Sequence, residues 1–166
     1  MTILGISIGT TRTGVAVLKD DVLLDRQIHR NERVWSDNKL RMILNLYKQY
    51  VVKRSVQAIV VKIPPPKKLT PPLKRLLRRI EALAKKHGCD FDLTTKNELK
   101  HVTGVRSTIE LVKYTTLLYP ELAPVFDKGV DNNHMYHRKL FEAVLSAYIY
   151  SGRQQLKSER IKNTTE

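Results

Sequence analysis

The sequence predicts an α/β fold in which helices flank a single mixed, five-stranded sheet. Two observations lead to this prediction. The first thirty residues contain three runs of alternating apolar and polar residues, which is typical of an antiparallel meander. After them, short apolar runs alternate with segments of helical periodicity, which is typical of strands joined by helices. The 166 residues suffice for one domain with an ordinary hydrophobic core.

Three strands separated by two turns open the chain. Apolar residues alternate in ILGISI, in VAV and in the segment from Val22 to Ile28. The intervening segments GTTRTG and KDD consist largely of residues that tolerate turn geometry. Because short turns join antiparallel neighbours, these segments predict a three-stranded meander.

The middle of the chain predicts a helix, a central strand and a second helix. Ser36 or Asp37 can cap the first helix, which runs to about Lys53. The nearly continuous apolar run VQAIVVKI predicts a strand covered on both faces. The proline-rich segment PPPKKLTPP then leads into a strongly amphipathic helix over 73–86, which Gly88 ends.

The remaining segments predict one more strand and three helices. CDFDLTT forms the strand, and helices follow over 97–102, over 108–118 with Ser107 as the cap, and over 136–150. Residues 151–166 are polar, and we expect a frayed or disordered tail there. Since no repeat or composition change divides the chain, residues 1–150 are expected to form a single domain.

Charge is the most informative property of the composition. Thirty lysines and arginines oppose sixteen acidic residues, which gives a formal net charge of +14. This excess favours nucleic acid as a partner, because basic side chains neutralise phosphates and release their counterions. No apolar run approaches the roughly 18 residues of a membrane span. The single cysteine, Cys89, excludes an internal disulfide, and we expect a cytoplasmic protein.

Several of these segments together resemble RuvC-type Holliday junction resolvases, a family of the ribonuclease H-like superfamily. ILGISIGTTRTGVAVL resembles the opening hairpin of that family, AIVVKIPPP its central strand, and LFEAVLSAYIY its closing helix. LTTKNELKHVTGVRSTIELVKYTTLLYPEL is similar to the strand, linker and helix between them. The resemblance extends to about Tyr150. It implies a ribonuclease H-like fold, DNA as the partner and a homodimer.

The resemblance also assigns the family's acidic positions to residues of this chain. Family members cut phosphodiesters with two divalent metals, which need three or four converging carboxylates. Here Ser7 occupies the first-strand position, and Val61 or Lys62 the central-strand position. Lys139 and Glu142 occupy the pair on the closing helix. One carboxylate out of four predicts that no two-metal site forms, so we expect no cofactor.

Two hypotheses concern Glu142. In the first, Lys62 forms an ion pair with Glu142 and replaces the metal charge with an ammonium group; side chains more than about 6 Å apart would contradict it. In the second, the protein is an active crossover junction endodeoxyribonuclease that requires Mg²⁺ or Mn²⁺. Its catalytic carboxylates would then be Glu142 and Asp131, with Asp127 and Asp21 as further loop acids that could join them.

The nucleic-acid-binding residues are expected in two basic clusters. One comprises the amphipathic helix and the proline-rich loop before it, and the other lies around Glu142. A solvated helix face that only aids solubility is the alternative for the first cluster. His134 and His137 lack the further ligands of a transition-metal site, so phosphate contact is favoured in the second. The predicted contacts are Lys67, Lys68, Lys74, Arg75, Arg78, Arg79, Arg106, Lys113, Arg138 and Lys139.

These observations favour a RuvC-like protein that binds duplex or branched DNA without cutting it. Two other classes stay open besides the active nuclease. Sugar kinases and actin-like ATPases also carry a Gly-Thr-Thr phosphate loop, although their chains are far longer. A scaffold protein could use the same fold for protein contacts, and its interactions would then be insensitive to salt.

Overall fold

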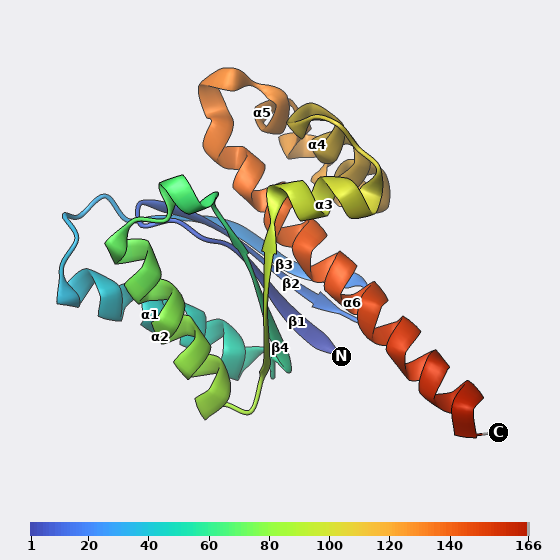
Figure 1. Cartoon of the computed structure of the whole chain (residues 1–166). Helices are drawn as coiled ribbons and strands as arrows, with labels where there is room; N and C mark the ends of the chain where they lie inside the picture. Colours follow the sequence, from blue (N-terminus) through green and yellow to red (C-terminus); the bar gives the residue numbers. More distant parts are fainter. Residues whose placement is uncertain (166) are drawn as a thin grey trace.

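A computed structural model describes residues 1–165, except for the side chains of residues 132–134. One sheet separates two helical layers (Figure 1). Helices α1 (Asp37–Lys53) and α2 (Pro71–Lys86) cover one face of the sheet. The helices from α3 onward lie on the other face, where α6 crosses the strands.

The sheet has five strands in the order β3-β2-β1-β4-β5. The first three form the predicted antiparallel meander, and β4 and β5 run parallel to β1. The predicted mixed sheet is therefore confirmed. The strand bounds are β1 Thr2–Ser7, β2 Arg12–Lys19, β3 Val22–Arg30, β4 Ala58–Ile63 and β5 Asp90–Thr95.

Side-chain caps begin both helices of the first layer, and the cap at Ser36 is one that the sequence predicts. The Ser36 hydroxyl accepts a hydrogen bond from the backbone N–H of Lys39 at the start of α1. Thr70 caps α2 in the same way, after a short 3-10 helix, η1 (Pro66–Lys68). Gly88 follows α2 with φ +68°, a conformation that favours glycine.

The second layer contains α3 (Lys96–Thr103), α4 (Thr108–Leu118), η2 (Pro120–Val125), α5 (Phe126–Val130), η3 (Asn132–His137) and α6 (Arg138–Thr165). Residues 151–165, for which the sequence predicts a frayed or disordered tail, instead continue α6 to Thr165. Figure 1 shows this last part of α6 extending beyond the sheet. Its residues from Gln155 onward are exposed, which explains their polar composition. No helix of the described chain is long and apolar enough to span a membrane.

Two glycines let α6 lie directly on the sheet. An added Cβ atom at Gly5 would collide with the carbonyl oxygen of Ala143, and one at Gly14 with that of Lys139. Glycine removes this obstacle on β1 and on β2. The backbone of α6 is therefore held against the sheet at the residues that carry the candidate site.

Candidate functional site

The candidate site lies where three parallel strands end. Ser7 on β1 is the register partner of Lys62 on β4, and Lys62 is the partner of Thr94 on β5. The carboxyl ends of parallel strands meet at one edge of a sheet, which is where ligands bind in open α/β folds. The first turns of α6 lie over this edge.

The register decides which residue of β4 faces α6. Val61 packs in the apolar cluster with α1 and α2, on the opposite face of the sheet. Successive side chains of a strand point to opposite faces, so Lys62 points toward α6. Of the two residues predicted for the central-strand position, Lys62 is therefore the one that faces α6.

Lys62 and Glu142 form an ion pair in the interior. The Nζ atom of Lys62 lies 2.5 Å from Oε2 of Glu142, and their side chains are 10% and 3% exposed. The Nζ atom of Lys96, the first residue of α3, lies 3.8 Å from Oε1 of the same carboxylate. The hypothesis of a Lys62–Glu142 ion pair is confirmed, and both carboxylate oxygens face an ammonium group.

A third lysine reaches the same site from the first turn of α6. The Nζ atom of Lys139 donates a hydrogen bond of 2.9 Å to the carbonyl oxygen of Ile8. Burial, and secondarily the charge of Lys62, lowers the pKa of Lys139 to about 8, against the opposing effect of Glu142. Burial also lowers the pKa of Lys96. Three lysines thus surround one carboxylate, a formal excess of two positive charges.

The other candidate acids are Asp21, Asp127 and Asp131. Asp21 is in the β2–β3 turn at the far end of the sheet, where Gln155 donates a hydrogen bond to its carboxylate. Asp21 is therefore excluded from the site. Asp127 is in the first turn of α5, and its carbonyl accepts a hydrogen bond from the backbone N–H of Asp131, the C-terminal cap of α5. Among the described residues, no group of three or more His, Cys, Asp or Glu could hold a metal ion.

Ser7 is fully buried at the end of β1. Within the described part of the chain, its hydroxyl oxygen has no hydrogen-bond partner. A hydroxyl carries no negative charge, so Ser7 offers a weaker ligand to a divalent cation than a carboxylate would. His137 lies in η3, with its ring against Tyr136, and the side chain of His134 lies outside the described residues.

The predicted basic contacts occur on both faces of the sheet and do not form one surface. Arg106 and Lys113 are exposed in the α4 layer, and Arg138 donates a hydrogen bond to the carbonyl of Gly129. Arg75 on α2 forms an ion pair of 2.6 Å with Asp37. The predicted contacts that are exposed on the α2 side are Lys67, Lys68, Lys74, Arg75, Arg78 and Arg79.

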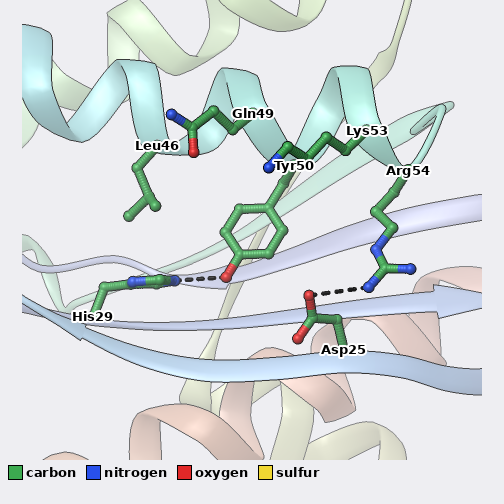
Figure 2. Close-up of a pocket in the computed structure, with 7 residues that line it drawn as sticks. All are labelled: Asp25, His29, Leu46, Gln49, Tyr50, Lys53 and Arg54. Carbon is green, nitrogen blue, oxygen red and sulfur yellow. Dashed lines mark hydrogen bonds and ion pairs between the residues drawn. The ribbon is translucent and has the colours of Figure 1, made fainter.

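A hollow with a volume of about 510 Å³ lies between β3 and α1. Figure 2 shows that four of its side chains form two pairs: Tyr50 and His29 share a hydrogen bond of 2.6 Å, and Arg54 lies 3.4 Å from Asp25. Burial lowers the pKa of His29 and raises that of Tyr50 to about 12. Because the two pairs already occupy four of its polar side chains, the lysine-rich edge is the stronger candidate site.

We did not predict from the sequence that Lys96 belongs to this site, or that Gly5 and Gly14 allow α6 to approach the sheet. Lys96 directly follows the predicted strand CDFDLTT, which is β5 in the structure, and that position places it at the same edge as Lys62. This signal was available, because parallel strands end together. The need for Gly5 and Gly14 follows from the approach of a helix far along the chain, so no local signal existed.

Comparison with known proteins supplies the fold. No protein-family model and no curated protein sequence matches this chain. The structure of RuvC from Thermus thermophilus superimposes with a TM-score of 0.74 at 13% identity, covering 95% of this chain and 97% of that one. RuvC from the same organism in complex with a Holliday junction substrate gives 0.71 at 13% identity, with 95% and 96% covered. The chain therefore has the ribonuclease H-like fold of RuvC, as its sequence predicts.

Proposed function

We propose that this protein binds duplex or branched DNA through its basic residues and does not cut it by two-metal chemistry at Glu142. The fold and the net charge of +14 support DNA binding. The absence of two-metal cleavage is proposed because the carboxylate of Glu142 already lies beside two ammonium groups. Its two carboxylate oxygens lie 2.5 Å from Lys62 Nζ and 3.8 Å from Lys96 Nζ.

Electrostatics explains why this arrangement disfavours metal ions. A divalent cation at Glu142 would have to displace an ammonium group that is already paired there. It would then lie beside lysines in a partly buried site, where repulsion between like charges is weakly screened. The hard, oxygen-rich ligand set that Mg²⁺ needs is replaced by Ser7 and two lysines.

The structure of RuvC with a Holliday junction substrate motivates branched DNA as the ligand. Lysines and arginines bind the phosphate backbone, which positions a protein without reading bases. Specificity would then come from the shape of the DNA and the placement of charge. This account requires no base-reading motif.

Fluorescence anisotropy with a labelled four-way junction, duplex and single strand tests the proposal. We expect binding of the junction or duplex that weakens steeply between two salt concentrations, and intact strands after incubation with Mg²⁺ or Mn²⁺. Metal-dependent cutting that Glu142→Ala abolishes would contradict the proposal and favour the nuclease built on Glu142 and Asp131. Binding that is insensitive to salt would favour the scaffold protein.

The homodimer implied by the family resemblance remains a prediction. Light scattering coupled to gel filtration should give twice the mass of the chain for the protein alone, and that mass plus the mass of the junction for the complex. A monomer in both conditions would contradict it.

A further inference from the structure

We infer that Lys62, Lys96 and Lys139 around Glu142 form a binding site for one phosphate group of the nucleic-acid backbone. We call these four residues the lysine centre. The inference rests on the proposed function and names the chemical group that this site takes. An anion would thus bind at the edge of the sheet where a two-metal nuclease holds cations.

The first argument is charge. In the part of the chain whose side chains are described, the carboxylate that these ammonium groups approach is that of Glu142. One negative charge leaves two of the three positive charges without compensation. Uncompensated charge in a partly buried site is unfavourable, and an anion relieves it. A backbone phosphodiester carries one negative charge and several acceptor oxygens.

The lowered pKa of Lys139 reflects this excess of positive charge. Its pKa falls to about 8 because it is buried and because Lys62 and Lys96 repel its charge, with Glu142 opposing the change. Arg138 adds positive charge, since it contributes to the lowered pKa of Lys96. The first turn of α6 contains no acidic residue, so the positive end of the helix dipole is not offset there.

The second argument is access from solvent. Lys62 is nearly buried, whereas the side chain of Lys96 is 35% exposed and Lys139 is half-buried. A phosphate can therefore reach two of the ammonium groups from outside. An added Cβ at Gly9 would lie 3.3 Å from Lys139 Nζ. Because Gly9 has no side chain, the β1–β2 loop leaves space next to this ammonium group. Ser7 also places a fully buried hydroxyl without a described partner beside Lys62.

The test measures how affinity for a labelled duplex depends on salt. Each lost phosphate contact lowers the slope of log affinity against log salt by about one. We expect this decrease for Lys96→Gln and for Lys139→Gln. Lys19→Gln is the matched control, because Lys19 is exposed at the opposite end of the sheet and should leave the slope unchanged.

Glu142→Gln separates an anion site from a metal site. Removing the carboxylate charge increases the positive charge of the lysine centre, so we expect tighter binding of the duplex. A metal site at Glu142 predicts the opposite result, weaker binding of the duplex by Glu142→Gln. Weaker binding by a folded Glu142→Gln protein would overturn the inference.

The outcomes distinguish this inference from the proposed function. If both lysine variants keep the slope of the unsubstituted protein, the phosphate site is wrong and DNA binding by other residues stands. If the unsubstituted protein does not bind DNA, both are wrong. Should Lys139→Gln fail to fold by circular dichroism, Lys96→Gln decides the question.

Inorganic phosphate separates a backbone phosphate from a free one. At equal ionic strength, phosphate should raise the melting temperature of the unsubstituted protein above its value in chloride, and by less in Lys96→Gln. This shift together with a reduced slope supports the inference. The shift with an unchanged slope would assign the site to free phosphate and overturn the backbone assignment.

Discussion

Lys62 Nζ lies 2.5 Å from Glu142 Oε2, and this ion pair joins the end of β4 to helix α6. Both side chains are almost completely buried, so water screens their attraction little. The contact links β4 to a helix that the chain reaches only in its last third. The same pair therefore contributes to the stability of the fold and sets the charge of the candidate site.

Removing one partner of this pair should destabilise the protein strongly. Lys62→Met leaves the Glu142 carboxylate buried, with only the longer contact to Lys96. We expect the free energy of unfolding in urea to fall by about 3 kcal/mol, because a buried charge loses its partner.

The double variant Lys62→Met with Glu142→Leu is the control for that measurement. Replacing both charges by apolar side chains removes the cost of burying them, so most of the lost stability should return. Additive losses in the two single variants and the double variant would show that the pair is not energetically coupled.

The short distance between the backbones of α6 and the sheet predicts opposite effects on stability for two glycine substitutions. Gly14→Ala places a methyl group against the backbone of Lys139 and should lower the free energy of unfolding by about 2 kcal/mol. Gly152 is in α6 itself, and an added Cβ there would have no neighbour within 4 Å. Gly152→Ala should therefore raise the free energy of unfolding by up to about 1 kcal/mol. Equal effects in thermal denaturation would contradict the close approach at Gly14.

Each exposed arginine of α2 should contribute one phosphate contact to DNA binding. Arg78→Gln and Arg79→Gln are each expected to lower the salt slope of duplex binding by about one. Arg75→Gln should lower it less, because Asp37 already neutralises Arg75. Slopes equal to that of Lys19→Gln in all three variants would instead support a solvated helix face.

Lys139 should make stability depend on alkaline pH. Burial lowers its pKa from 10.5 to about 8, so between these values the unfolded chain binds more protons than the folded one. The contribution of Lys139 to stability therefore rises with pH across this window. We expect the unsubstituted protein to gain about 1 kcal/mol relative to Lys139→Met between pH 8 and pH 9.

The pH comparison is best kept below pH 10. Burial raises the pKa of Tyr47 and of Tyr50 to about 12, so above pH 10 these tyrosines make the folded state lose stability with pH. Urea titrations at several pH values provide the measurement. A difference between the two proteins that does not change with pH would contradict a lowered pKa for Lys139.

Much of the fold follows from local features of the sequence. Strand alternation gave the meander, and the hydroxyls of Ser36 and Ser107 marked helix starts that the structure confirms. The Lys62–Glu142 pair could also be predicted, because family resemblance brought the two positions together. These features depend on periodicity of two or of 3.6 residues and on caps, which neighbouring residues determine.

Only the tertiary structure decided what the edge of the sheet contains. The parallel register of β1 with β4 turned Lys62, and not Val61, toward α6, since a shift of one residue exchanges the faces of a strand. The approach of α6 over Gly5 and Gly14 set Lys139 beside Ile8, and the start of α3 added Lys96. The sequence by itself determined the elements and the excess of positive charge. Where that charge converges depends on contacts between distant segments, which no local pattern encodes.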